Sequence, residues 1–254
     1  MFTSLIEAFC SRGANRSVIL EEIGGDLSVR VNDHSIHPPA SLSKLLVAIA
    51  FVEAGIDPSA PVAANRIASS QFPSIINALG PNAPLTYGHL LAYSIATSDN
   101  PSANRLLQEV GRSHVYDIAL GLELAYPYSP AGFGDSSFDE MYDERTTASD
   151  VALVMKHIYA NRTKRGYDMI WTAMLNNLRN ARIPAEMPDD IPVAHKTGTL
   201  LGVYHDAGFV RLPRRDLLLV VLTSDELDEF ATNHEIAILA QAINLLKICD
   251  DNTS

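Results

Sequence analysis

A serine and a lysine three positions apart, Ser41 and Lys44, stand at the start of an apolar segment of the chain. A serine hydroxyl is a weak nucleophile at neutral pH and needs a neighbouring base. Residues i and i+3 lie on one face of a helix, so the Lys44 amine is expected close to the Ser41 oxygen. Burial favours the neutral amine, which would suit Lys44 to act as a general base. Ser43 is a rival nucleophile, but Lys44 serves it poorly because adjacent helical residues do not face one another.

A second group of polar residues, Ser98, Asp99 and Asn100, ends one predicted helix and is followed by Pro101. Proline favours a turn or a fresh helix start there. A hydroxyl and a carboxamide that project from such a loop can relay a proton to a leaving group and hold a substrate amide. Helix capping alone would also account for this motif.

The third group is the run from His195 through Lys196, Thr197 and Gly198 to Thr199, at the end of a predicted strand. Glycine allows a ligand to approach the backbone closely, and a lysine attracts a substrate carboxylate. An edge-strand N–H can polarise a carbonyl group. Taken alone, this run is more typical of an ordinary turn.

Elements from both ends of the chain must position these residues. Apolar and polar residues alternate around Gly24 and Gly25, which predicts a β-hairpin after a first helix. The segment 41–55 is apolar on nearly every face, as expected of a helix buried on all sides. Further elements are predicted by hydrophobic periodicity: helices over 85–97, 102–110, 147–162, 167–178 and 234–248, and strands over 191–199, 206–213 and 216–224.

This order of elements predicts an α/β fold in which one antiparallel sheet is built from both chain termini and flanked by helices, with an all-helical lobe inserted. We expect residues 1–35 and 184–254 to form the α/β lobe and residues 36–183 the helical lobe. The natural place for a site is the cleft between them.

Composition excludes several classes of function. The chain has 254 residues, 47% of them hydrophobic, and a net charge of -11. That charge disfavours nucleic acid and anionic membrane surfaces as partners. No apolar run reaches the length of a membrane span. The start of the chain has no signal-peptide pattern, which points to the cytoplasm, or to a periplasmic or secreted protein if a leader has been removed.

Metal and cofactor sites are not expected. The two cysteines, Cys10 and Cys249, form neither a disulfide framework nor a metal site, and no HExxH spacing occurs. His34 and His37, three residues apart in a proline-flanked segment, are interpreted as part of a surface loop.

Together the three motifs carry more weight than each alone. Ser-x-x-Lys, Ser-Asp-Asn and Lys-Thr-Gly occur here in the order typical of class A β-lactamases and penicillin-binding proteins. The resemblance extends over essentially the whole chain, through PASLSKLLVA, SIATSDNPSANRLL, RTTASDVALVM and VAHKTGTLLGVYHDAGFV. The chain therefore resembles a class A β-lactamase-related serine hydrolase.

The resemblance implies a role for each matching residue. Ser41 would be acylated and Lys44 would act as base or relay. Ser98 would pass protons and Asn100 would hold the substrate amide. Lys196 and Thr197 would bind a carboxylate, and the oxyanion hole would consist of the backbone N–H groups of Ser41 and Thr199. The implied partner is a small-molecule amide or ester that bears a carboxylate.

One part of the pattern is missing. Class A β-lactamases carry a glutamate, with an asparagine four residues later, that activates the deacylating water. No acid between Asn100 and Thr146 has an asparagine four positions later. Asp135 is the nearest candidate for the deacylation base, although a turn residue in Gly134-Asp135-Ser136-Ser137 is the simpler interpretation.

Three functions therefore remain open at the level of sequence. The first is a class A β-lactamase-like serine hydrolase that forms an acyl-enzyme on Ser41 and hydrolyses a β-lactam or a related amide or ester. Rapid β-lactam hydrolysis is not expected of it, because the deacylating glutamate is not found. The second is a D-alanyl-D-alanine carboxypeptidase or other penicillin-binding protein, a family that shares the motifs and lacks the glutamate. The third is a sensor that is acylated without turnover.

Overall fold

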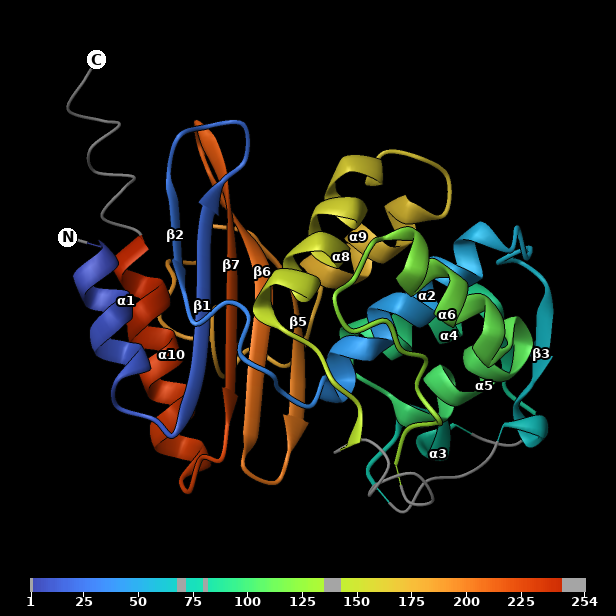
Figure 1. Cartoon of the computed structure of the whole chain (residues 1–254). Helices are drawn as coiled ribbons and strands as arrows, with labels where there is room; N and C mark the ends of the chain where they lie inside the picture. Colours follow the sequence, from blue (N-terminus) through green and yellow to red (C-terminus); the bar gives the residue numbers. More distant parts are fainter. Residues whose placement is uncertain (1, 68–71, 80–81, 135–142, 244–254) are drawn as a thin grey trace.

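The fold is seen in a computed structural model that describes residues 2–67, 72–79, 82–134 and 143–243. One five-stranded antiparallel sheet has the order β2-β1-β7-β6-β5. β1 pairs along its whole length with β7, from Asn15 opposite Ser224 to Glu22 opposite Leu217. The two ends of the chain thus share one sheet, as predicted (Figure 1). Its strands are β1 (Asn15–Glu22), β2 (Ser28–Val31), β5 (Val193–Leu200), β6 (Val203–Leu212) and β7 (Arg215–Ser224).

Both faces of this sheet are covered, which is why its inner strands are apolar at nearly every position. On β7, Leu218 and Val220 pack toward the large helical core. Their neighbours Leu217 and Leu219 point to the opposite face, because successive side chains alternate along a strand. That face is covered by α1 (Phe2–Cys10) and α10 (Glu229–Ile243) (Figure 1).

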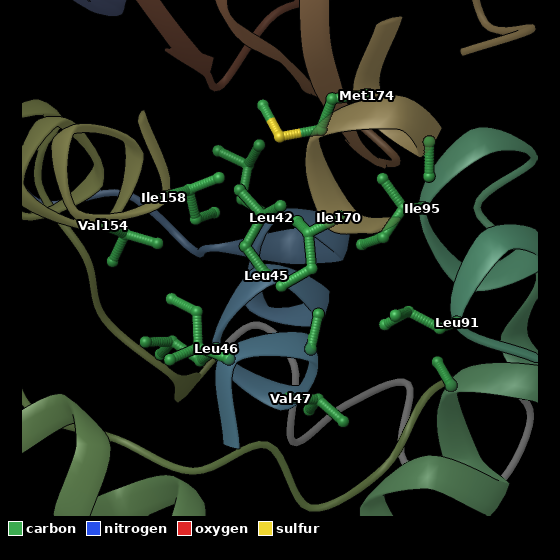
Figure 2. Packing of buried hydrophobic residues seen from close by; sticks show 14 of the residues in the cluster. Leu42, Leu45, Leu46, Val47, Leu91, Ile95, Val154, Ile158, Ile170 and Met174 are labelled. Atoms are coloured by element: carbon green, nitrogen blue, oxygen red, sulfur yellow. The ribbon is translucent and has the colours of Figure 1, made fainter. Parts of the chain in front are cut away.

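The other face of the sheet carries the helical part of the chain. At its centre lies α2 (Lys44–Glu53), every residue of which from Lys44 to Phe51 is buried. Figure 2 shows Leu45, Leu46 and Val47 of α2 among side chains of the surrounding helices, including Leu91, Ile158 and Ile170. The surrounding helices are α3 (Ile75–Ala78), α4 (Tyr87–Ala96), α5 (Asn100–Val110), α6 (Arg112–Gly121), α8 (Ala148–Asn161) and α9 (Tyr167–Leu175).

Several elements differ from the prediction. The helical part also contains a two-stranded ladder of β3 (Pro61–Ala63) and β4 (Pro84–Thr86), so it is not all-helical. Strands of three residues are too short to show an alternating pattern. The last helix begins at Glu229 rather than at residue 234, and its predicted end lies outside the described residues. The lobe boundaries at 35/36 and 183/184 stay predictions. Among the described residues, no helix is long and apolar enough to span a membrane.

Candidate active site

Ser41 lies in a 3₁₀ turn, η1 (Ala40–Ser43), that leads directly into α2. Its side chain lines a cavity of about 760 Å³. The residue before it, Ala40, has a φ of 49°, in the left-handed region that a residue with a Cβ adopts only when its surroundings hold it there. Ser43 is buried and its hydroxyl donates to the Ala40 carbonyl at 2.6 Å. The structure therefore presents Ser41, and not its rival Ser43, to the cavity.

Two buried histidines hold the segment that leads to Ser41. The prediction that His37 lies in a surface loop is wrong, because its side chain is fully buried. Its Nδ1 and Nε2 contact the hydroxyls of Ser224 and Ser17 at 2.9 and 2.8 Å. Burial lowers the pKa of His37 to about 4. These contacts come from the first and last strands of the chain, which no local pattern reveals.

His205 on β6 is the second of these histidines. Its Nδ1 accepts from the backbone N–H of Thr223 at 3.1 Å, so its Nε2 carries the proton and donates to the Pro38 carbonyl at 2.7 Å. The pKa of His205 lies well below the ordinary value, first because of burial and then because of His37 nearby. The bond accepted at Nδ1 requires the neutral ring, and the bond donated from Nε2 fixes Pro38 to the sheet three residues before Ser41.

Lys44 is completely buried, one turn after Ser41. Its Nζ lies within hydrogen-bonding distance of the Ser98 carbonyl oxygen at 2.6 Å, of Ser98 Oγ at 3.2 Å and of Asn100 Oδ1 at 2.6 Å. The ring of Phe133 lies on another side of the amine, with its centroid 5.0 Å from Nζ. Burial lowers the pKa of Lys44 well below its usual value, and the charge of Lys196 adds to this effect. This burial favours the neutral amine that a general base requires, and the role of Lys44 as the base for Ser41 stays a prediction.

The loop between α4 and α5 presents Ser98 and Asn100 to this amine. Asp99 caps α5 and is buried, accepting from Ser102 N at 2.9 Å and from Ile75 N at 3.0 Å. Ser98 itself has a φ of 58°, a conformation that depends on these fixed neighbours. The polar residues that predicted a helix cap do form one, and the cap orients the residues on either side of Asp99.

Lys196 on the edge strand β5 is also completely buried. Its Nζ donates to Ser98 Oγ at 2.9 Å and to the Thr197 carbonyl at 2.8 Å. Burial, together with the charges of Arg179 and Arg182, lowers the pKa of Lys196 to about 7, against the opposing effect of Asp206. The Ser98 hydroxyl thus connects two buried lysine amines, an arrangement able to carry a proton between them.

Gly198 sets the spacing between β5 and the turn that carries Ser41. A Cβ at this position would lie 3.2 Å from the Pro39 carbonyl oxygen and 3.3 Å from Ala40 Cβ. Glycine is needed because the two backbones approach so closely. Thr199, one residue further along β5, lines the same cavity as Ser41.

The cavity brings together Ser41, Ser98, Asn100, Thr197 and Thr199 of the predicted site residues. Lys44 and Lys196 do not line the cavity, but each is hydrogen-bonded to Ser98, which does. Asp135 falls outside the described residues. The cavity-lining residues are Ser41, Phe72, Pro73, Ser98, Asn100, Gly134, Leu178, Arg179, Asn180, Ala181, Arg182, Thr197, Thr199, Leu200, Leu201, Tyr204, Glu229 and Asn233.

Arg182 is a site residue that the sequence reasoning missed. It is buried and donates to Thr199 Oγ1 at 2.8 Å, to the Gly198 carbonyl at 3.1 Å and to Asn233 Oδ1 at 2.7 Å. Its position in an irregular segment before β5 gives no periodic signal. Arg182 therefore adds a buried positive charge to the side of the cavity formed by β5. No cluster of metal-ligating side chains occurs among the described residues.

Comparison with known proteins gives one family and one fold. The chain matches the sequence profile of the Beta-lactamase enzyme family over residues 2–246. The TLA-3 extended-spectrum β-lactamase superimposes with a TM-score of 0.86 at 20% identity, over 97% of this chain and 98% of the other. A β-lactamase from Sphaerobacter thermophilus does so with a TM-score of 0.82 at 23% identity, over 97% and 96% of the two chains.

The same fold occurs in a penicillin-binding protein. PBP-A superimposes with a TM-score of 0.80 at 18% identity, over 96% of each chain. Among curated protein sequences, none matches this chain.

The fold and the profile together define the class of protein. It is an active-site serine hydrolase with the architecture of the class A β-lactamases and PBP-A. The chain belongs to the Beta-lactamase enzyme family, whose members act on small-molecule amides.

Proposed function

We propose that the protein forms an acyl-enzyme on Ser41 with a small-molecule amide or ester that carries a carboxylate. The observation that carries this proposal is the convergence of two fully buried amines, Lys44 and Lys196, on the Ser98 hydroxyl beside Ser41. Burying an amine without a paired carboxylate lowers its pKa and makes it a base near neutral pH.

The acylation step uses these groups in sequence. Ser41 Oγ attacks the carbonyl carbon and forms the new C–O bond, while its proton passes to Lys44. The bond from that carbon to the leaving nitrogen or oxygen then breaks, and Ser98 relays the proton from Lys44 to the leaving atom. The backbone N–H groups of Ser41 and Thr199 hold the oxyanion, a contribution of about 3 kcal/mol for each donor. Hydrolysis of the acyl group by water completes the turnover.

The positive side of the cavity favours a carboxylate on the substrate. Lys196 donates to the Thr197 carbonyl, and Arg182 donates to the Thr199 hydroxyl. In the described part of the lining, Glu229 is the single acid against Arg179 and Arg182. Asn100, held by Lys44 through its Oδ1, offers its side-chain amide to the substrate amide. A variant of PBP-A has been solved as an acyl-enzyme complex with penicillin G, which makes a penicillin a suitable probe for this chain.

A second candidate function shares the acylation step but not rapid release. A penicillin-binding protein of the D-alanyl-D-alanine carboxypeptidase kind, or an acylated sensor, would keep the adduct longer. The apolar ring of Phe133 beside Lys44 favours this candidate, because an aromatic ring accepts no proton from water.

Intact-mass spectrometry after incubation with penicillin G tests the shared step. We expect the mass of one penicillin to be added to the protein, and the adduct to be absent from Ser41→Ala. Ser43→Ala is the matched control, because it removes the neighbouring hydroxyl that is buried away from the cavity, and it should still be acylated. Lys44→Ala should fold and fail to be acylated. An adduct that survives in Ser41→Ala would place the nucleophile elsewhere.

A further inference from the structure

Two buried cations beside the cavity have only neutral groups as hydrogen-bond partners. Lys196 donates to the Ser98 hydroxyl and to the Thr197 carbonyl. Arg182 donates to a hydroxyl, two carbonyl groups and a side-chain amide oxygen. A buried charge is costly unless an opposite charge lies nearby. The charged form of Lys196 therefore depends on an anion that does not itself contact the amine.

Asp206 on β6 is a carboxylate placed to supply that charge. It is fully buried and lies directly opposite Thr197 in the ladder of β5 and β6. Successive side chains alternate along a strand, so Asp206 and Lys196 lie on opposite faces of the sheet, one position apart. Burial lowers the pKa of Lys196, and the charge of Asp206 opposes this effect. The pKa of Arg182 is affected by burial and by Asp206 in the same two directions.

His195, the residue before Lys196, holds this carboxylate. Its ring is buried, and its Nδ1 lies 2.8 Å from Asp206 Oδ1. The other carboxylate oxygen, Oδ2, accepts from Ile183 N at 3.0 Å. On its far side, the His195 ring places Nε2 at 3.1 Å from Asn180 Oδ1. Both oxygens of Asp206 thus have a fixed partner, and the same contacts tie the irregular segment before β5 to the sheet.

We propose that Asp206 is a positioning residue for the substrate carboxylate: its buried negative charge keeps Lys196 in the ammonium form that attracts the carboxylate, and His195 holds Asp206 in place. The inference rests on the proposed acylation of Ser41 by carboxylate-bearing substrates. Asp206 does not line the cavity. It therefore acts through Lys196 and not by contact with the substrate.

The other charged groups that act on the Lys196 amine are positive. Arg179 and Arg182 both lower its pKa, and Lys44 shares a hydroxyl partner with it. Replacing Asp206 by asparagine removes the opposing charge and leaves these cations in place. The ammonium form of Lys196 should then be lost at a lower pH, and the attraction of a substrate carboxylate should be lost with it.

The test is the second-order rate of acylation by penicillin G and by its methyl ester between pH 6 and pH 9, measured by intact mass after rapid quenching. In Asp206→Asn the rate for penicillin G at pH 7 should fall about fivefold or more, and its alkaline fall should begin at a lower pH than in wild type. The rate for the uncharged ester should change much less. An unchanged pH profile in folded Asp206→Asn would overturn the proposal.

Asp150→Asn is the matched control. Asp150 is also a buried carboxylate that accepts from two backbone N–H groups, those of Ala125 and Tyr126, but it lies on α8 and does not line the cavity. Its substitution should leave the pH profile of acylation as in wild type. A shift in Asp150→Asn equal to that in Asp206→Asn would also overturn the proposal.

Lys196→Arg separates the charge of Asp206 from a merely structural role. A guanidinium stays charged over this pH range without help from a neighbouring carboxylate. Adding Asp206→Asn to Lys196→Arg should therefore reduce the acylation rate with penicillin G far less than Asp206→Asn does in wild type. An equal loss in the two backgrounds would show that Asp206 only supports the fold.

A measurement on wild type decides the proposal if Asp206→Asn does not fold. The side-chain carboxyl carbon of Asp206, assigned through the backbone by NMR of labelled protein, should report an ionised group throughout pH 6 to pH 9. A protonated carboxyl in this range would overturn the role of Asp206. Absence of a penicillin G adduct on wild type would instead overturn the proposed function, so the two failures are distinguishable.

Discussion

Lys196 should make acylation by anionic substrates fall with rising pH, while acylation by neutral substrates does not. Its amine is fully buried and its pKa is lowered to about 7. A carboxylate on the substrate is attracted only by the protonated amine. Above pH 7 Lys196 loses its charge, and its part of the attraction between substrate and site is lost with it.

The size of the effect follows from the titration. The charged fraction of Lys196 is about one half at pH 7 and falls to about one eleventh at pH 8 and about one hundredth at pH 9. The second-order acylation rate reports the pKa of the free enzyme. That rate should therefore fall by a factor of about 10 to 50 between pH 7 and pH 9, the smaller value allowing for attraction by Arg182, which keeps its charge.

Stopped-flow acylation by penicillin G and by its methyl ester provides the assay. The ester lacks the negative charge, so its acylation rate should not show this fall. Lys196→Arg should remove the alkaline fall for penicillin G, because its guanidinium stays charged throughout this range. Parallel profiles for the acid and the ester would refute the assignment of the carboxylate to Lys196.

Two other predictions test the segment that holds Ser41. His37 is neutral in the fold with a pKa of about 4, against 6.5 for the free side chain. Its contribution to the free energy of unfolding is therefore complete above pH 6.5 and is lost as the pH falls toward 4. The loss due to His37 is about 3 kcal/mol of unfolding free energy. Between pH 7 and pH 4, urea unfolding should show a loss smaller by about this amount in His37→Phe than in wild type, and equal losses would contradict the prediction. Gly198→Ala should push β5 away from the Ser41 turn and slow acylation about tenfold or more at nearly unchanged stability. An unchanged acylation rate would show that this contact does not set the spacing.

The parts of the fold that the sequence predicted are those with a local signal. Alternation around Gly24 and Gly25 predicted the hairpin of β1 and β2, which the structure confirms. The uniformly apolar segment after Ser41 predicted a central buried helix, as α2 is. Asp99 and Pro101 marked the break between two helices because capping depends on neighbouring residues.

The parts that were missed depend on contacts between distant segments. His37 was expected in a surface loop, but it is buried and its Nδ1 contacts the hydroxyl of Ser224, which is 187 positions further along the chain. Arg182 lies in an irregular segment, and its role follows only from the positions of Thr199 and Asn233. Phe133 likewise gave no signal, since nothing in its neighbourhood of sequence indicates that its ring lies against Lys44.

The pairing of β1 with β7 determines when, during synthesis, the protein can first be acylated. Asn15 and Ser224 are 209 positions apart and lie opposite one another in the sheet. Contacts within the helical part join closer segments and can form earlier, because closing a long loop is slow. A growing chain therefore holds Ser41, Lys44 and Ser98 long before β5 and β6 are in place. Labelling by a fluorescent penicillin should then report complete folding, and a stalled or truncated chain should remain unlabelled.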